Sequence, residues 1–192
     1  MKISKKITDS ILFVLSAAAL AVGLIGSTPI FASLAQTDET DESTGSLAYD
    51  NPNLGFTLEY PTDWTKEESL SFTSPMLSSS DEAPESISVT TEVLVSNITL
   101  EEYSDSAISS LEDQFPNFTL IESSNSTLSG YPAHQIVYTY TFNGVDLKNF
   151  QIWTIADNIV YAITYGGITS EFDDSLPVIK NMIDSFELTE IQ

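Results

Sequence analysis

The sequence predicts an α+β domain in which an antiparallel sheet of about six strands is covered by helices. Three observations predict this class. Apolar and aromatic residues form three long strands in quick succession between residues 133 and 165, a clear helix signature begins at Thr99, and a second amphipathic helix follows Phe172. The sequence contains no internal repeat, so we expect one folded unit.

Alternation of apolar and polar residues predicts the first strands. In the stretch GFTLEYPTDW, Phe56, Leu58 and Tyr60 alternate with polar residues until Pro61. This stretch is either a binding motif with exposed aromatics or the first core strand and the corner that ends it. We favour the core strand, with Trp64 packed on the sheet. Further strands are expected at 69–73 and 87–95, with a loop rich in Ser, Pro and acids between them.

A capping box opens the first helix. In Thr99-Leu100-Glu101-Glu102, the Thr and Glu side chains can satisfy each other's free backbone donors. Pro116 ends the helix. The stripe expected to face the sheet consists of Leu100, Tyr103, Ala107, Leu111 and Phe115.

The next segment predicts an antiparallel meander. A strand starts at 118–122, residues 129–132 form a turn, and three strands follow at 133–142, 145–155 and 159–165. Asn143-Gly144 and Asp157-Asn158 supply the two tight turns, because these residues tolerate positive φ. Gly166-Gly167 is expected to close the last strand.

The final helix is indicated by apolar residues three and four positions apart: Phe172, Leu176, Ile179, Ile183 and Phe186. Pro177 fits if Asp173 or Asp174 caps the helix, because amides of the first turn have no partner within the helix. Residues 186–188 can add an edge strand.

The N-terminal region predicts export. The segment MKISKK is positive, residues 11–25 are apolar, Pro29 follows, and small residues precede a cleavage point after Ala35. Residues 1–35 are therefore expected to be a signal peptide, and an uncleaved N-terminal anchor is the alternative. Residues 36–48 have the composition of an acidic, disordered linker, and the domain is expected at 49–192. Both alternatives predict a secreted or extracytoplasmic domain, anchored only if the apolar segment is retained.

Composition excludes several functions. The chain carries 28 acids, six lysines and no arginine, for a net charge of -22, so it cannot neutralise the phosphates of nucleic acid. This charge favours cations or a basic partner protein. The chain contains no cysteine, which rules out disulfides, thiol catalysis and cysteine-bound zinc.

No motif indicates catalysis, so we expect no enzyme. His134 is the single histidine, and a partly buried structural role is expected for it. The acidic pairs lack the spacing of a calcium loop, so no cofactor is expected, although weak calcium or manganese binding at 80–85 stays open. The aromatics of the meander either line a ligand groove or fill the core, and we favour the core. They are Tyr138, Tyr140, Phe142, Phe150, Trp153, Tyr161 and Tyr165.

Three Asn-x-Ser/Thr triplets could accept glycans in an exported protein. They begin at Asn97, Asn117 and Asn125. The first has a competing structural role, because its Thr99 belongs to the expected capping box.

Three motifs together resemble the PsbP-like family. They are the opening NPNLGFTLEYPTDW, the meander segments QIWTI and YAITY, and the helix ending IDSF. This family includes a lumenal subunit of the photosynthetic oxygen-evolving complex and has secreted prokaryotic relatives, among them the archaeal ones that this sequence looks most like. The resemblance implies an α/β/α sandwich around an antiparallel sheet, a fold shared with a nuclear-transport factor that binds a small GTPase.

The resemblance also implies a binding or assembly role without catalysis. The photosystem role does not carry over, because docking there uses an N-terminal segment and basic residues that this chain lacks. We therefore expect an exported, non-catalytic subunit that binds an unknown protein partner, basic or membrane-associated, at the cell surface. A divalent-cation or small-ligand binding protein is the alternative.

Overall fold

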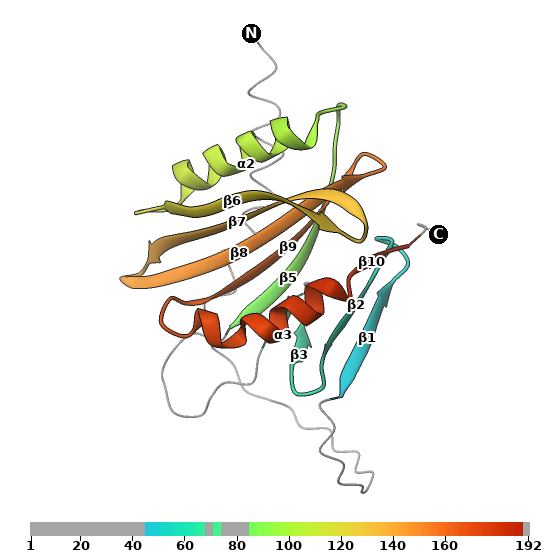
Figure 1. The fold of residues 1–192 in the computed structure, drawn as a ribbon, viewed down its shortest axis with the longest axis horizontal. Coiled ribbons are helices and arrows are strands. Elements are labelled where there is room, and N and C mark those ends of the chain that lie inside the picture. Colours follow the sequence, from blue (N-terminus) through green and yellow to red (C-terminus); the bar gives the residue numbers. More distant parts are fainter. Residues whose placement is uncertain (1–44, 68–70, 74–84, 190–192) are drawn as a thin grey trace, which may run out of the picture.

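Two sheets and two helices form the domain (Figure 1). The structure, a computed structural model, describes residues 45–67, 71–73 and 85–189. Its elements are β1 (Ser46–Asn51), β2 (Phe56–Pro61), β3 (Thr65–Glu67), β4 (Ser71–Thr73), β5 (Ser86–Val93), α2 (Leu100–Gln114), β6 (Thr119–Leu128), β7 (Tyr131–Phe142), β8 (Val145–Ala156), β9 (Ile159–Ile168), α3 (Phe172–Asp184) and β10 (Glu187–Leu188).

The expected α+β sandwich is confirmed. A seven-stranded antiparallel sheet has the order β3-β4-β5-β9-β8-β7-β6, and α2 covers one of its faces (Figure 1). The other face carries α3 and a second, three-stranded sheet of order β1-β2-β10. The sequence predicted one sheet of about six strands. The division into two sheets follows from β2, which pairs with β1 and β10 and not with the long strands.

Each face of the large sheet has its own core. Under α2, the predicted stripe residues Tyr103, Ala107 and Leu111 are buried against the meander. On the opposite face, Phe172, Ile179 and other α3 residues pack against the sheet and against β2. Both helices are therefore held mainly by burial of one apolar side.

The predicted meander and first helix are confirmed. Strands β7, β8 and β9 pair in uninterrupted antiparallel register. The Asn143-Gly144 and Asp157-Asn158 turns have the positive φ angles that this type of hairpin requires. At the start of α2, Thr99 and Glu102 form both hydrogen bonds of the capping box.

Strand β1 and strand β3 were not predicted. Strand β1 begins at Ser46, and all of its residues are exposed or half-buried. Because it has no buried face, its sequence resembles that of a linker. Pairing with β2 stabilises it, through a turn in which Asn51 accepts hydrogen bonds from the amides of Leu54 and Gly55. The β3 segment contains only three residues, too few to show alternation.

Two expectations about local structure were wrong. Helix α3 starts at Phe172 with no side-chain cap, so neither Asp173 nor Asp174 is the cap and Pro177 lies inside the helix. Tertiary contacts explain why the helix already begins at Phe172. The centroid of the buried Phe172 ring lies 4.7 Å from that of Tyr165, and Asp173 pairs with Lys148.

The second error concerns Gly166 and Gly167, which lie within β9 and do not end it. Strand β9 continues to Ile168 because β8 extends equally far, and Leu147 of β8 pairs with that residue. Among the described residues, no helix is long and apolar enough to span a membrane.

Candidate functional site

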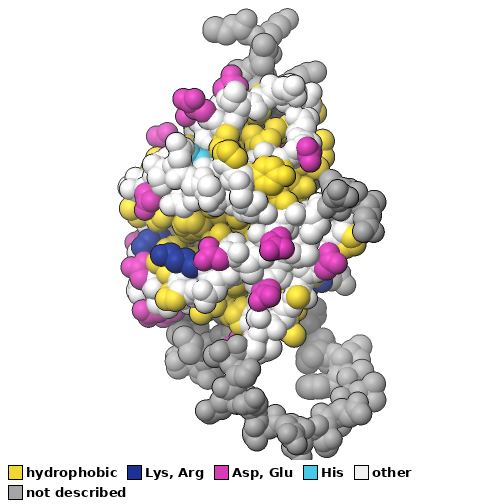
Figure 2. All heavy atoms as spheres, turned by 45° about the vertical axis from the view of Figure 1, so that its right-hand side comes forward, with side chains coloured by type: hydrophobic (Ala, Val, Ile, Leu, Met, Phe, Trp, Pro, Cys, Tyr) yellow, Lys and Arg dark blue, Asp and Glu magenta, His cyan; other side chains and the backbone are white. Residues whose placement is uncertain are grey.

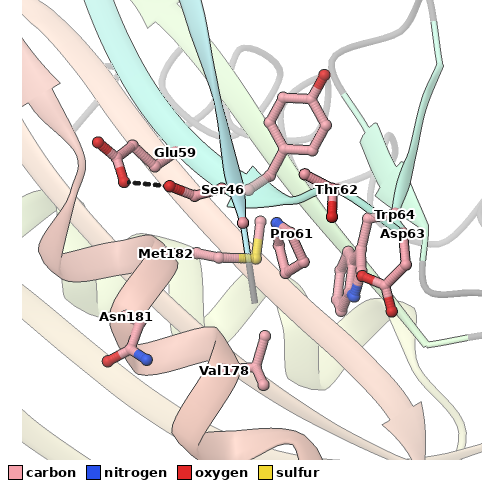
Figure 3. A pocket seen from close by; sticks show the side chains of 11 residues that line it. Ser46, Glu59, Pro61, Thr62, Asp63, Trp64, Val178, Asn181 and Met182 are labelled. Carbon is pink, nitrogen blue, oxygen red and sulfur yellow. Dashed lines mark hydrogen bonds between the residues drawn. The ribbon is translucent and has the colours of Figure 1, made fainter. Parts of the chain in front are cut away.

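The stretch that ends β2 lines an open pocket between the small sheet and α3 (Figure 3). This α3 pocket has a volume of about 650 Å³. It is lined by Gly45, Ser46, Glu59, Tyr60, Pro61, Thr62, Asp63, Trp64, Val178, Asn181 and Met182.

Alternation in β2 explains why core and pocket meet here. Phe56 and Leu58 are fully buried, as predicted, and Phe56 packs on the ring of Phe186. Tyr60 continues the same face but lies at the strand end, where it is half-buried. The chain then turns at Pro61, whose carbonyl accepts a hydrogen bond from the Trp64 amide.

The floor of the pocket is apolar and fixed by the core. Trp64 is 8% exposed and Met182 only 2%, so each shows just an edge to the pocket. Val178 of α3 is 38% exposed, so it presents more apolar surface to the pocket than Trp64 or Met182 does. These side chains lie around one opening in Figure 3. The expectation that Trp64 packs on the sheet is confirmed, and the same residue lines the pocket.

Polar groups hold the pocket walls. The Ser46 hydroxyl donates to Glu59 Oε2 over 2.8 Å, which ties the start of β1 to β2. The Glu59 amide donates to the Ser185 hydroxyl over 2.9 Å, which ties β2 to the end of α3. Glu59 and Asp63 are exposed, so the rim of the pocket carries negative charge.

The sequence indicated only the part of this pocket formed by residues 59–64, and not the parts contributed by β1 and α3. Val178, Asn181 and Met182 come from a helix more than a hundred residues away, and Ser46 comes from an unpredicted strand. One signal was available. Val178 is apolar, but the helical spacing places it outside the row of α3 residues that faces the sheet. An apolar residue at such a position indicates an exposed apolar surface on the helix.

His134 has the structural position predicted for it. It lies on β7, its ring centroid is 5.5 Å from that of Trp153, and its Nε2 is 2.9 Å from the Ser123 hydroxyl. Burial lowers the pKa of His134, and the charge of Asp105 opposes this effect only in part. The side chain is therefore neutral at pH 7 and held as a packing group.

Glu85 forms hydrogen bonds within the fold. It is the one described residue of the acidic loop at 80–85. Its carboxylate accepts hydrogen bonds from the buried Tyr165 hydroxyl, over 2.7 Å, and from the Ser175 hydroxyl. Burial, then the hydrogen bond and charge of Glu85, raise the pKa of Tyr165. Glu85 thus fastens the start of β5 to the first turns of α3.

Most of the other acids that the structure describes are exposed and dispersed over the surface. Within the described ranges, no group of three His, Asp or Glu side chains comes together as a metal site. Glu102 caps α2 and Asp173 pairs with Lys148, while Glu67-Glu68 and Asp81-Glu82 fall wholly or in part outside the described residues. The face in Figure 2 shows acidic side chains spaced apart over the surface.

The meander aromatics belong mainly to the core. Tyr138, Tyr140, Trp153, Tyr161 and Tyr165 are buried, and Phe142 and Phe150 pack against the two cores.

Asn97, Asn117 and Asn125 are all exposed. Their glycosylation stays a prediction. The Thr99 hydroxyl of the first triplet is engaged with Glu102, as expected.

Several solved structures share this fold. LpqN of Mycobacterium tuberculosis, involved in cell envelope biogenesis, is 17% identical, with a TM-score of 0.58 over 70% of this chain and 83% of LpqN. Cyanobacterial PsbP from Synechocystis is 13% identical, with a TM-score of 0.57 over 80% of this chain and 98% of that one. The Ran-binding protein Mog1p of Saccharomyces cerevisiae is 10% identical, with a TM-score of 0.54 over 77% and 97% of the two chains.

At these identities the solved structures establish the fold alone, and no curated protein is a match for this chain. The family is established by sequence. The pattern of the PsbP-like proteins matches residues 11–188, which is most of the chain. The resemblance seen in the motifs is thereby confirmed, and this chain belongs to the PsbP-like protein family.

Proposed function

We propose that this protein is an exported, non-catalytic binding protein that engages a partner protein at the cell surface through the α3 pocket. The observation that carries the proposal is the pocket itself, an open hollow with an apolar floor and a carboxylate rim. Such a site accepts an apolar side chain while its polar edge orients the partner.

The side chains of the pocket support binding. Its core-packed floor is pre-formed, because Trp64 and Met182 are already immobilised by the α3-side core. A pre-formed floor lowers the entropic cost of binding. The rim carboxylate of Glu59 is engaged by the Ser46 hydroxyl, which gives it a structural role within the wall.

Charge supports a basic partner. After residue 35 the chain has 27 acids and three lysines, for a net charge of -24. A field of this sign attracts cationic surfaces and accelerates their encounter with the protein. An anchoring apolar residue flanked by Lys or Arg therefore fits the α3 pocket best.

The fold relatives and the N-terminus agree with this role. Mog1p binds Ran and LpqN is involved in cell envelope biogenesis, so the same fold serves in binding and at the envelope. The positive and apolar segments before residue 36 support export.

The test is capture with matched variants. Full-length tagged protein is expressed in its own cells as wild type, Val178→Glu and Val145→Glu, and envelope proteins that co-purify are quantified. Val178 and Val145 are 38% and 45% exposed, so both substitutions are surface changes of equal charge. Circular dichroism confirms that the variants fold.

We expect one partner to co-purify with wild type and Val145→Glu and to be lost with Val178→Glu. The added carboxylate would strengthen a purely electrostatic association with a basic protein, so a loss identifies apolar contact in the pocket. Equal recovery with all three proteins would contradict the role of the pocket. Recovery of no protein by wild type under gentle conditions would contradict the binding function.

A further inference from the structure

A second apolar surface lies at one end of the large sheet, away from the α3 pocket. Val93 ends β5 and pairs with Ile159, which starts β9 and pairs with Ala156 of β8. Tyr131 starts β7 two residues before Ala133, the partner of Thr154, so Tyr131 lies level with Ala156. We call Val93, Ile159, Ala156 and Tyr131, with Val95 just beyond, the end strip.

Along the strip, Ala156 is buried and Ile159 half-buried at the edge of the core under α3, whereas the residues at its two ends are exposed. Alternation places Val93 on the same face as the buried Ile87 and Val89. Val93 nevertheless is 70% exposed, Val95 is 78% and Tyr131 is 42%. These ends lie at the right of Figure 1 and come forward in Figure 2, whose upper part shows hydrophobic side chains gathered between acidic ones. Apolar residues left exposed at both ends of such a row on an acidic protein are candidates for an interaction surface.

Acids border the end strip. Asp157 lies in the turn between Ala156 and Ile159. Burial raises the pKa of Tyr161, and the charges of Asp157 and Tyr131 add to this effect, so each of the two lies near Tyr161. Asp184 and Glu187 line a smaller hollow of about 390 Å³ beside the β6–β7 turn. The lysines that the structure describes, at 66, 148 and 180, lie on β3, β8 and α3, and none is at these strand ends.

The size and charge of the strip decide between two possible occupants, a second copy of this chain and a single cationic amphipathic element of another protein. The exposed parts of Val93, Val95 and Tyr131 amount to roughly 300 Å² at most, whereas a stable dimer buries about 800 Å² on each partner. A second copy would also bring a like charge of more than 20 against the first. A single cationic amphipathic element suffers neither penalty.

Geometry favours a helix. The strip crosses four adjacent strands, a distance of roughly 14 Å at the usual strand spacing. This length equals about two and a half helical turns, over which a helix presents apolar residues at positions i, i+4 and i+7. Lysines or arginines on the flanks of that helix would lie near the bordering acids.

We propose that the end strip is a docking surface for a cationic amphipathic helix of another protein. Apolar residues along one side of that helix cover Val93, Ile159 and Tyr131, and its basic residues face Asp157. This surface is separate from the α3 pocket, so it does not depend on the function proposed for that pocket.

The experiment uses a designed probe. A fluorescent 14-residue Lys/Leu helix is titrated with the full chain at about 0.15 M salt, where screening removes most long-range attraction. We expect saturable binding by wild type, and binding at least about tenfold weaker in Val93→Glu and Val95→Glu, the loss expected when one central contact is removed. An otherwise identical Glu/Leu helix is expected not to bind.

Three controls keep the outcome decisive. Ile121→Glu, at a site 56% exposed on β6, and Val178→Glu, in the α3 pocket, add the same charge elsewhere and should leave probe binding unchanged. Loss of binding in Val178→Glu would place the probe in the α3 pocket and overturn the proposal. Equal or tighter binding by Val93→Glu and Val95→Glu would show simple charge attraction, and binding of the Glu/Leu helix would show non-specific apolar contact; each result overturns the proposal.

Discussion

Replacement of Gly166 by alanine tests whether β9 needs a glycine at this position to leave room for Asn149. A Cβ atom at this position would lie 2.7 Å from Oδ1 of Asn149, which is 3% exposed. The Asn149 amide donates to the hydroxyl of buried Tyr138 over 3.0 Å. Gly166 does not have positive φ, so the backbone accepts alanine and the conflict is one of space. The added methyl must therefore displace Asn149 and break its hydrogen bond to Tyr138.

The expected cost can be worked out from these contacts. Losing the partner of a buried hydroxyl costs about 1–3 kcal/mol, and forcing a methyl group into a packed site costs about 1–3 kcal/mol. Replacing glycine removes conformational freedom from the unfolded chain, which returns about 0.4–1 kcal/mol. We expect Gly166→Ala to lower the free energy of unfolding by about 2–3 kcal/mol, allowing for partial relaxation. For a domain of this size the Tm should fall by about 4–10 °C.

A double-mutant cycle identifies the cause. Free energies of unfolding are measured by urea denaturation for wild type, Gly166→Ala, Asn149→Ala and the double variant. When Asn149 is already alanine, the new methyl meets no Oδ1, so Gly166→Ala should then cost less than about 0.5 kcal/mol. Additive costs within that margin would refute the reasoning, because they would show that Asn149 is not the obstacle.

Three further predictions concern capping and ionisation. Thr99→Ala should cost about 1 kcal/mol of stability. NMR titration should show the pKa of Glu102 rising only part of the way to its ordinary value, because the backbone hydrogen bond from residue 99, the larger cause of the lowered pKa, remains and only the side-chain hydrogen bond is lost. Burial raises the pKa of Glu92 despite its hydrogen bond from Tyr103, so this carboxylate destabilises the fold above that pKa. Glu92→Gln should therefore raise the urea midpoint at pH 7, and the gain should vanish below pH 4.5; an unchanged midpoint at pH 7 would contradict this. His134 should titrate below 6.5 by NMR, and stability should fall as the pH decreases from 6.5 through that lowered pKa, an effect that His134→Gln should remove.

The sequence was most informative where a local pattern and a turn signal agreed. The meander was predictable because Asn143-Gly144 and Asp157-Asn158 fix the hairpins between strands of strong alternation. Helix α2 was predictable because its capping box, apolar stripe and Pro116 all give the same boundaries. Where turn residues, apolar periodicity and capping residues all predict the same element, that segment can be predicted without knowledge of its tertiary contacts.

Prediction failed where distant contacts decide local structure. Strand β1 is exposed or half-buried, and it exists because β2 offers a full set of backbone partners. Helix α3 starts at Phe172 because Tyr165 and Lys148, which come from β9 and β8, hold its first turn. No local pattern contains that information.

The α3 pocket illustrates why a surface pocket is harder to predict than the strand that carries it. Period-two alternation gives the face of Phe56, Leu58 and Tyr60, but it does not show where the covering layer stops. Phe56 and Leu58 lie under α3, whereas Tyr60 lies at the strand end, where the chain turns away at Pro61. The two interpretations of GFTLEYPTDW therefore apply to different halves of one stretch. Its first half forms core, and its second half continues that face to the surface at Tyr60 and Pro61 before Trp64 returns to the edge of the core; this second half lines the site that we propose for a basic partner.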